Sequence, residues 1–411
     1  MRSYQDMRIF CLQNGGEYAE KVKQERAARY EGAWSLCFPF EVKEYPAFVV
    51  LNRELQGQIA SINQKNIQLV QLCCSLPERA IEQFVKTSMV EEIQQSNEFE
   101  NVHSTRREIR EAMAEIGEKP SGKRFDGMVR KYDMLVSHKT IALCSSTDIR
   151  KLYDEFILDE VIRENPRHAP DGSVFRRDKT YVNGKGEAIH KGLYPERRII
   201  EAMDGALRVL GDLQIDPLIR TAVFHYMFGY IHPFYDGNGR MSRFISSYTL
   251  SSFGYAVPLC LRLSYVIKEH RKAYQRAFRD TNDSRSMGEL TTFVMEFLRF
   301  IEQAIDETLL SLQEKEKANT YYQALLRRFI DRNEKALQKY GTLLSWMLET
   351  ELFGNERFDV QELALISDLS ANTIRSIIAK CGTLLVCEKD GNKNVYHIDK
   401  AYLDVLLTDD E

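Results

Sequence analysis

The sequence of 411 residues predicts a mainly α-helical protein that contains a β-hairpin and ends in a winged-helix domain. Apolar residues recur at helical spacing over residues 51–84 and 217–231, which predicts packed helices. Strand signals are few, namely an Asn-Gly pair at 183–184 and two β-prone runs near the C-terminus. The length suggests about two or three domains with enough material for buried cores.

The N-terminal part carries weak signals first and helical ones later. Residues 1–40 are mixed in character, and we expect irregular structure that packs on the rest of the chain. The helical pattern of 51–84 breaks at Pro77. Thr105 and Glu108 have the spacing of a capping box, so a further helix should begin near Ser104.

Residues 165–195 predict a β-hairpin. The β-prone residues 175–182 precede Asn183-Gly184 and Gly186, and Asn-Gly between such residues is a signal of a hairpin turn. A surface hairpin is the simplest interpretation.

The stretch from His232 to Arg243 contains most of the residues that could carry chemistry. Asp216-Pro217 supplies an N-cap and a proline at the first helical position, and the apolar residues that follow predict a buried helix. Pro233 disfavours helical geometry at His232, which places this imidazole where a rigid helix ends. His232 is therefore the candidate general base.

A phosphate site is predicted directly after this histidine. Asp236-Gly237-Asn238-Gly239 leads through two glycines into a new helix, whose unpaired amides and dipole favour an anion. Arg240 and Arg243 are one turn apart and can reach the same anion. Asp236 would repel phosphate unless Mg²⁺ lies between them, so it is a candidate metal ligand. Each feature alone is common in turns, but together they predict a phosphoryl- or nucleotidyl-transfer site.

This stretch resembles the signature of the Fic (Fido) family, His-x-Phe-x-Asp/Glu-Gly-Asn-Gly-Arg-x-x-Arg, at every signature position. The resemblance implies a protein adenylyltransferase, which transfers AMP from ATP to a protein hydroxyl and releases pyrophosphate. It implies that His232 deprotonates the hydroxyl of a Ser, Thr or Tyr, and that Asp236 holds Mg²⁺ on the α- and β-phosphates. Arg240 would bind the β-phosphate and Arg243 the γ-phosphate.

The resemblance assigns further residues to the nucleotide. Phe234 would anchor the loop, while Gly237, Asn238 and Gly239 would line the anion nest. Family members with altered chemistry often change the acidic or glycine positions, so the residues kept here favour AMP transfer over phosphate transfer. Two residues of a later helix would lie near the adenine, Tyr274 and Asn282.

The resemblance also makes the predicted hairpin a flap, over about residues 172–193. Its exposed edge would pair with an extended segment of the target protein and bring the target hydroxyl to His232. Main-chain pairing accepts many sequences, so it leaves the target protein unspecified. Self-modification and a homodimer are both compatible with the sequence.

A second feature of the family, an inhibitory helix with Ser/Thr-x-x-x-Glu-Gly/Asn, is matched by Ser96-Asn-Glu-Phe-Glu100-Asn101. The spacing places Ser96 and Glu100 on one face of a helix that covers about residues 90–101. The resemblance implies that Glu100 pairs with Arg243 and blocks the productive position of the γ-phosphate. A solvated acidic helix face is the simpler alternative.

The composition favours a soluble cytoplasmic protein. A net charge of −4 supplies no global basic field that would attract nucleic acid. The eight cysteines form no Cys-x-x-Cys or Cys/His ligand pattern, which indicates reduced thiols. The sequence shows no signal-peptide pattern and no apolar run that approaches the length of a membrane span.

Residues 341–411 predict the winged helix, with helical segments, a turn, a further helix and two β-prone runs. DNA binding is the usual function of this layout. However, six Lys/Arg against thirteen Asp/Glu give these residues a balance of −7, which opposes a phosphate footprint. We therefore expect a protein-interaction module, although a local basic patch leaves DNA binding open. The patch consists of Arg375, Lys380, Lys389 and Lys393.

The sequence thus predicts a helical N-terminal region over 1–101, a catalytic core over 102–312, a connecting helix over 313–340 and a winged helix over 341–411. Three alternative functions stay open. The same site could remove AMP from a modified protein, with Glu100 orienting a water, or transfer another phosphate-containing group. Alternatively, the chain is a DNA-binding regulator whose site senses a nucleotide.

Overall fold

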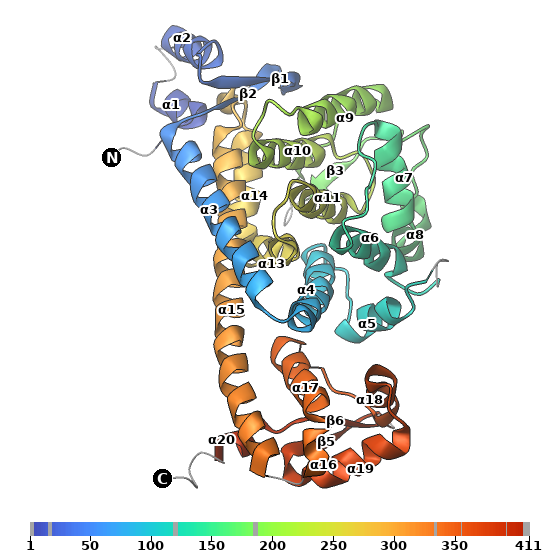
Figure 1. Cartoon of the computed structure of the whole chain (residues 1–411). Coiled ribbons are helices and arrows are strands. Elements are labelled where there is room, and N and C mark those ends of the chain that lie inside the picture. Colours follow the sequence, from blue (N-terminus) through green and yellow to red (C-terminus); the bar gives the residue numbers. More distant parts are fainter. Residues whose placement is uncertain are drawn as a thin grey trace. The chain divides into compact units, whose positions relative to one another are not determined.

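In the computed structural model, residues 4–14, 19–117, 122–183, 188–332, 335–354, 356–391 and 393–405 are described. The described chain is mainly helical, as predicted, and its strands form three two-stranded antiparallel sheets (Figure 1). It divides into two compact units, one of residues 1–67 and 88–306, the other of residues 68–87 and 307–411. The predicted four-part division stays a prediction. Within the described ranges, none of the helices has the length and apolar character needed to cross a membrane.

The first residues are regular, so the expectation of irregular structure over 1–40 was wrong. They form α1 (Met7–Asn14), α2 (Ala19–Tyr30) and the strands β1 (Ser35–Val42) and β2 (Tyr45–Val50). In α2 only Val22 is buried, so the sequence offers no apolar stripe from which to predict this helix. In β1, Phe38, Phe40 and Val42 are buried alternately, which is the period of a strand.

The long helical pattern that follows behaves as predicted. It forms α3 (Arg53–Ser75) and α4 (Glu78–Phe99), and the break falls at Pro77. Thr105 and Glu108 form both hydrogen bonds of a capping box at the start of α5 (Arg106–Ala114). Three helices and a short 3₁₀ turn come next: α6 (Asp126–Val136), α7 (Ser146–Phe156), α8 (Leu158–Glu164) and η2 (Pro166–His168).

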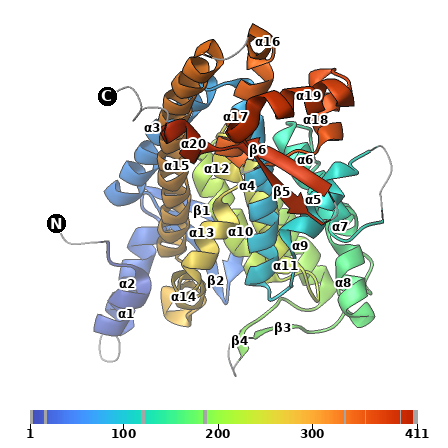
Figure 2. The same ribbon diagram turned by 90° about the horizontal axis from the view of Figure 1, so that it is seen from below.

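The predicted hairpin is present as β3 (Tyr181–Asn183) paired antiparallel with β4 (Ala188–Lys191). Figure 2 shows it at the edge of the first unit. Gly184 and Gly186, which carry part of the turn signal, lie outside the described residues.

The core of the first unit is built around α10 (Pro217–Ile231), which lies next to α9 (Glu196–Gly211) and α11 (Asn238–Ser252) (Figure 1). The side chain of Asp216 caps α10 through the amide of Leu218, as predicted. Almost every side chain of α10 is buried, since most of its residues are apolar and they are spread over all faces of the helix. Around it lie α12 (Val257–Cys260), α13 (Leu263–Glu269), α14 (Arg271–Thr281), η3 (Ser284–Ser286) and the start of α15 (Thr291–Arg332).

The end of the predicted catalytic core and most of the predicted connecting helix over 313–340 belong to one continuous helix, α15. The second unit continues with α16 (Lys335–Gln338), α17 (Gly341–Gly354), α18 (Val360–Ser367), α19 (Ala371–Cys381), η4 (Gly382–Leu384), β5 (Leu385–Asp390), β6 (Lys393–Ile398) and α20 (Lys400–Val405). From α17 to β6 this is the order of elements predicted for a winged helix. The assignment to that class stays a prediction.

Candidate active site

His232 stands at the end of the buried helix α10, as the proline after it predicts. Its backbone is left-handed, with φ of 53° and ψ of 63°, and its amide donates to the carbonyl oxygen of Phe228 at 2.9 Å. The helix therefore ends in a fixed turn, and the packing of α10 holds the backbone that carries this imidazole.

The loop after His232 is held by the core. Phe234 is fully buried, and its ring stacks on Tyr153 with a centroid distance of 3.7 Å. The side chain of Asn238 accepts a hydrogen bond from the Phe234 amide at 3.0 Å and donates one to the Phe234 carbonyl at 2.9 Å. The side chain of Asn238 thus braces the loop, and its expected place in the anion nest stays a prediction.

The start of α11 has the features of an anion site. Gly237 precedes the helix in a left-handed conformation, with φ of 79°, and its lack of a side chain leaves the first amides of α11 without a side-chain cap. Arg240 and Arg243 are both fully buried. Within the described chain, no residue accepts a hydrogen bond from the guanidinium of Arg240. A buried cation at a helix N-terminus without an acceptor is a site prepared for an anionic ligand.

Asp236 lies beside this helix start. Its Oδ1 accepts from the amide of Gly237 at 2.5 Å and lies 3.6 Å from Nη2 of Arg240. Its Oδ2 lies 3.4 Å from Nδ1 of His168, a residue of η2 that the sequence analysis did not single out. The carboxylate is one-third exposed, at 33%.

A divalent metal ion at Asp236 would need ligands from the nucleotide. In the ranges that the structure describes, no cluster of three or more His, Cys, Asp or Glu is placed to hold a metal. One accessible carboxylate oxygen beside a phosphate site does fit Mg²⁺, which is commonly bound by one or two carboxylates together with substrate phosphates.

Arg243 is engaged by the helix that contains the predicted inhibitory motif. Its Nη1 donates to Oε1 of Glu100 at 2.9 Å, its Nε to Oγ of Ser96 at 3.2 Å, and its Nη2 to the carbonyl oxygen of Ser96 at 2.8 Å. The ring of Phe99 contacts two guanidinium groups, with its centroid 4.7 Å from Cζ of Arg243 and 4.6 Å from Cζ of Arg271. The predicted pairing of Glu100 with Arg243 is thus present, with an aromatic contact that the sequence did not reveal.

Two residues explain how Glu100 reaches this position. α4 ends at Phe99, and Asn101 in the turn that follows is left-handed, with φ of 61°, a conformation that Asn and Gly adopt more easily than other residues. A Cβ atom at Gly239 would lie 1.9 Å from Oε1 of Glu100. The glycine therefore leaves the space that the carboxylate occupies.

These residues line one pocket of about 190 Å³. His232, Gly239, Arg243 and Glu100 lie in its wall, together with Phe99, Gly229, Asn238, Ser242, Arg271, Tyr274, Gln275, Phe278 and Asn282. The two residues expected near the adenine, Tyr274 and Asn282, thus belong to the same wall.

Behind the pocket, His225 joins three helices. Its Nδ1 lies 2.8 Å from Oγ of Ser246, and its Nε2 lies 2.8 Å from the hydroxyl of Tyr274. Complete burial lowers the pKa of His225 to about 3, and the nearby charge of Arg243 acts in the same direction. A neutral imidazole with hydrogen bonds at both ring nitrogens orients the hydroxyl of Tyr274 and does not act as a base.

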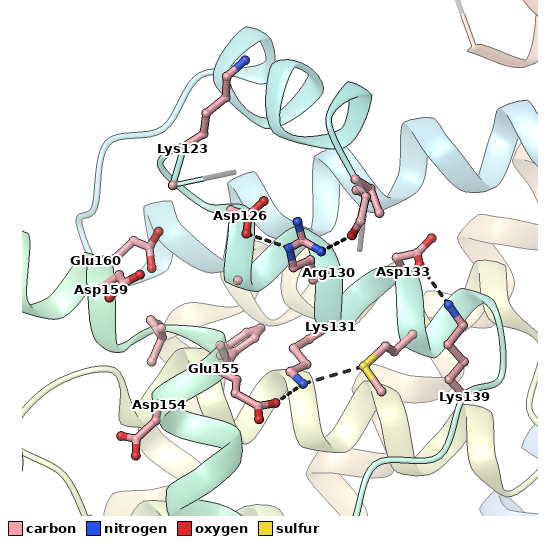
Figure 3. Close-up of a pocket in the computed structure, with 17 residues that line it drawn as sticks. Lys123, Asp126, Arg130, Lys131, Asp133, Lys139, Asp154, Glu155, Asp159 and Glu160 are labelled. Atoms are coloured by element: carbon pink, nitrogen blue, oxygen red, sulfur yellow. Dashed lines mark hydrogen bonds and ion pairs between the residues drawn. The ribbon is translucent and has the colours of Figure 1, made fainter. Parts of the chain in front are cut away.

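A larger cavity, of about 520 Å³, lies between α5, α6, α7 and α8 (Figure 3). Its charged side chains pair with one another, as Asp126 does with Arg130, Lys131 with Glu155 and Asp133 with Lys139. These ion pairs already use the charges concerned, so the cavity is a weaker candidate for an anion site than the start of α11, where the guanidinium of Arg240 has no hydrogen-bond acceptor among the described residues.

Comparisons with known proteins concern the same region. Residues 143–250 match the Fic/DOC family. Over 139 residues, the chain is 31% identical to a protein adenylyltransferase Fic of Culex quinquefasciatus, with 34% of this chain and 24% of that protein covered. The protein of the same name from Drosophila melanogaster is 29% identical over 139 residues, with 34% and 25% covered. The aligned part therefore spans about a quarter of the length of these relatives.

A solved structure shares the fold. A Fic family protein from Desulfovibrio desulfuricans G20 has a TM-score of 0.50 and 18% sequence identity, with 85% of this chain and 97% of that chain covered.

Proposed function

We propose that this chain, in which residues 143–250 form a Fic/DOC domain, transfers AMP from ATP to the hydroxyl of a Ser, Thr or Tyr in a target protein. The observation that carries the proposal is the start of α11, where the buried Arg240 has no acceptor in the described chain and His232 lines the pocket together with Gly239 and Arg243. The name of the aligned relatives, protein adenylyltransferase Fic, supports the same activity.

In the proposed reaction, His232 accepts the proton of the target hydroxyl. The hydroxyl oxygen then bonds to the α-phosphorus of ATP, and the bond from that phosphorus to the leaving oxygen breaks, which releases pyrophosphate. Arg240 binds the β-phosphate and, once released from Glu100, Arg243 binds the γ-phosphate. Asp236 is the residue that would hold Mg²⁺, which neutralises phosphate charge when bound.

We infer that the protein is autoinhibited in the form described. The donors of Arg243 are directed to Ser96 and Glu100, so a γ-phosphate cannot use them in this arrangement. The carboxylate of Glu100 also carries a negative charge into the pocket that the phosphates need. Release of this helix end is therefore part of the proposed catalytic cycle.

Removal of AMP from a modified protein is the second candidate. Glu100 and His232 line the same pocket, so a water that gives a proton to Glu100 would attack the α-phosphorus and form AMP, while protonated His232 donates a proton to the departing oxygen of the target side chain. Both activities need the same nucleotide site. They differ in the role of Glu100, which blocks the transfer of AMP to a protein but assists the removal of AMP from one.

The proposed partner is a protein in the cytoplasm. An extended segment of the target would pair with the edge of the β3–β4 hairpin, and the acidic residues 341–411 would serve protein interactions instead of DNA binding.

The proposal is tested by intact mass spectrometry and peptide mapping. Purified Glu100→Gly, and the same form with His232→Ala added, are each incubated with ATP, Mg²⁺ and a cell lysate. We expect AMP on hydroxyl side chains of one or a few proteins with the Glu100→Gly form of the enzyme, and none when His232→Ala is added to that form. Equal modification by both forms would refute the role of His232. Loss of AMP from a previously modified protein would support the second candidate.

A further inference from the structure

Arg176 lies between the β3–β4 hairpin and the end of α10, and the sequence analysis gave it no role. It is one of the largest fully buried side chains of the protein, with an exposed fraction of 0%. It is followed by the hairpin and is in contact with the residue proposed as the base. A charged side chain that is completely buried beside the proposed base needs a physical explanation.

The guanidinium of Arg176 binds main-chain carbonyl oxygens on both sides. Its Nε donates to His232 at 2.9 Å, and its Nη2 donates to Leu193 at 2.9 Å and, at 3.5 Å, to Ile231. Its Nη1 donates to Asp178 at 2.6 Å. One planar group thus joins the residues that enter the hairpin, the residues that leave it, and the C-terminus of α10.

Stability alone is a weak reason for this arrangement. A buried ion costs several kcal/mol of desolvation, and a well-packed apolar side chain of similar volume is often as stable or more stable. The cost is partly offset because carbonyl groups at a helix C-terminus carry negative partial charge. Unlike an apolar side chain, the guanidinium group has five donors in a rigid plane, so it can fix several carbonyl groups in one geometry.

Two neighbouring contacts tighten the same connection. A Cβ atom at Gly192 would lie 2.5 Å from Nη2 of Arg176 and 3.0 Å from Cβ of His232, so the strand leaving the hairpin passes directly against both residues. On the other side of His232, the hydroxyl of Tyr235 accepts from the amide of Asp178 at 3.0 Å. The lead-in to the hairpin is therefore fastened to the loop that carries the base.

We propose that Arg176 is the positioning residue that fixes His232 relative to the hairpin, so that a target hydroxyl held by the hairpin meets the base. The proposal rests on the proposed function, because it assumes that the hairpin aligns the target. If the proposal is correct, a substitution at Arg176 that loosens the hairpin also displaces His232. ATP binding at α11 should be independent of this contact.

The test uses Arg176→Met and Gly192→Ala, each in the Glu100→Gly form of the full chain. Gly192→Ala disturbs the same contact from the opposite side and keeps the guanidinium, so it serves where Arg176→Met folds poorly. The matched control is Arg220→Met. Arg220 is also a buried arginine, with an exposed fraction of 4%, and it binds the carbonyl oxygen of Leu210 at 3.1 Å, three turns of α10 away from His232.

Transfer of α-labelled phosphate from ATP and ATP affinity by calorimetry are measured for each form. A misplacement of the base by about 1 Å can slow a reaction on the order of a hundredfold. We therefore expect transfer by both test variants to fall on the order of a hundredfold, with ATP affinity unchanged, while Arg220→Met keeps the rate of its parent. Transfer at the parental rate by a folded Arg176→Met variant would overturn the proposal.

Hydrogen–deuterium exchange separates this proposal from the proposed function, since it requires no activity. We expect faster exchange in segments 176–183 and 231–235 together in Arg176→Met, and in neither segment in Arg220→Met. If the parent transfers no AMP but the two segments respond together, the coupling holds and the proposed reaction fails. If the segments respond independently, or not at all, the coupling is refuted whatever the activity.

Discussion

Replacing Glu92 by glutamine should stabilise the protein at neutral and alkaline pH and have little effect at acidic pH. Glu92 is completely buried in α4, two turns before Glu100, and both of its carboxylate oxygens accept from the amide of Ser264 at the start of α13, at 3.2 and 2.9 Å. Tyr132 of α6 lies at 3.4 Å. Glutamine keeps the acceptor for Ser264 and can donate to Tyr132, so the substitution removes mainly the charge.

The magnitude follows from the pKa of Glu92, which desolvation raises from 4.5 to about 7 against the opposing effects of its hydrogen bonds and of Arg243. Between these two pH values the folded protein holds a proton that the unfolded chain releases, so stability falls as pH rises. At about 1.4 kcal/mol per pH unit, the loss is ~3 kcal/mol, and it is complete above the folded-state pKa. The glutamine variant lacks this loss.

Thermal unfolding at about pH 5 and about pH 8 measures the difference. We expect the melting temperature of Glu92→Gln minus that of wild type to increase, by on the order of 5 °C, from about pH 5 to about pH 8. Glu91→Gln, an adjacent substitution at a partly exposed ion pair with Arg106, is the control and should show no such pH dependence. A stability difference between Glu92→Gln and wild type that does not change with pH would refute the reasoning.

Three further predictions concern the site. His232→Ala should abolish AMP transfer but retain ATP binding in calorimetry, because the imidazole acts on the hydroxyl; loss of ATP binding in a folded variant would contradict this. Asn238→Ala removes both hydrogen bonds to the backbone of Phe234 and should lower the free energy of unfolding by about 2 kcal/mol in denaturant titrations; an unchanged stability would mean that the loop does not need this brace. Arg240→Met should raise the melting temperature of the nucleotide-free protein, since it removes a buried charge that makes no hydrogen bond and has only a long ion pair with Asp236, at 3.6 Å, and should eliminate stabilisation by ATP. A variant that melts lower, and is still stabilised by ATP, would show that Arg240 has a structural role.

The sequence predicted those parts of the fold that depend on local patterns. The largely apolar α10, its N-cap at Asp216 and the end of the helix at His232 follow from residues that are neighbours in the chain. The glycine-led start of α11 is local in the same way. By contrast, α2 has almost no buried face, so periodicity could not reveal it.

The parts of the site that the sequence did not predict depend on distant segments. His168 approaches Asp236 only because α8 and η2 fold back on the loop, and no pattern around His168 indicates this. Arg176 stands in an ordinary Phe-Arg-Arg run, 56 positions from the carbonyl group of His232 that it binds. The contact of Glu100 with Arg243 spans 143 positions, and only a resemblance to a family could suggest it.

The most direct test of the central claim uses Glu100→Gly and wild type with ATP labelled separately at the α- and γ-phosphates, in the presence of Mg²⁺ and a cell lysate. The account predicts α-label on protein, more from Glu100→Gly than from wild type, and no γ-label from either. That result would establish AMP transfer and the inhibitory effect of Glu100 in one experiment. Protein that carries γ-label alone, or equal α-label from both forms, would contradict the account.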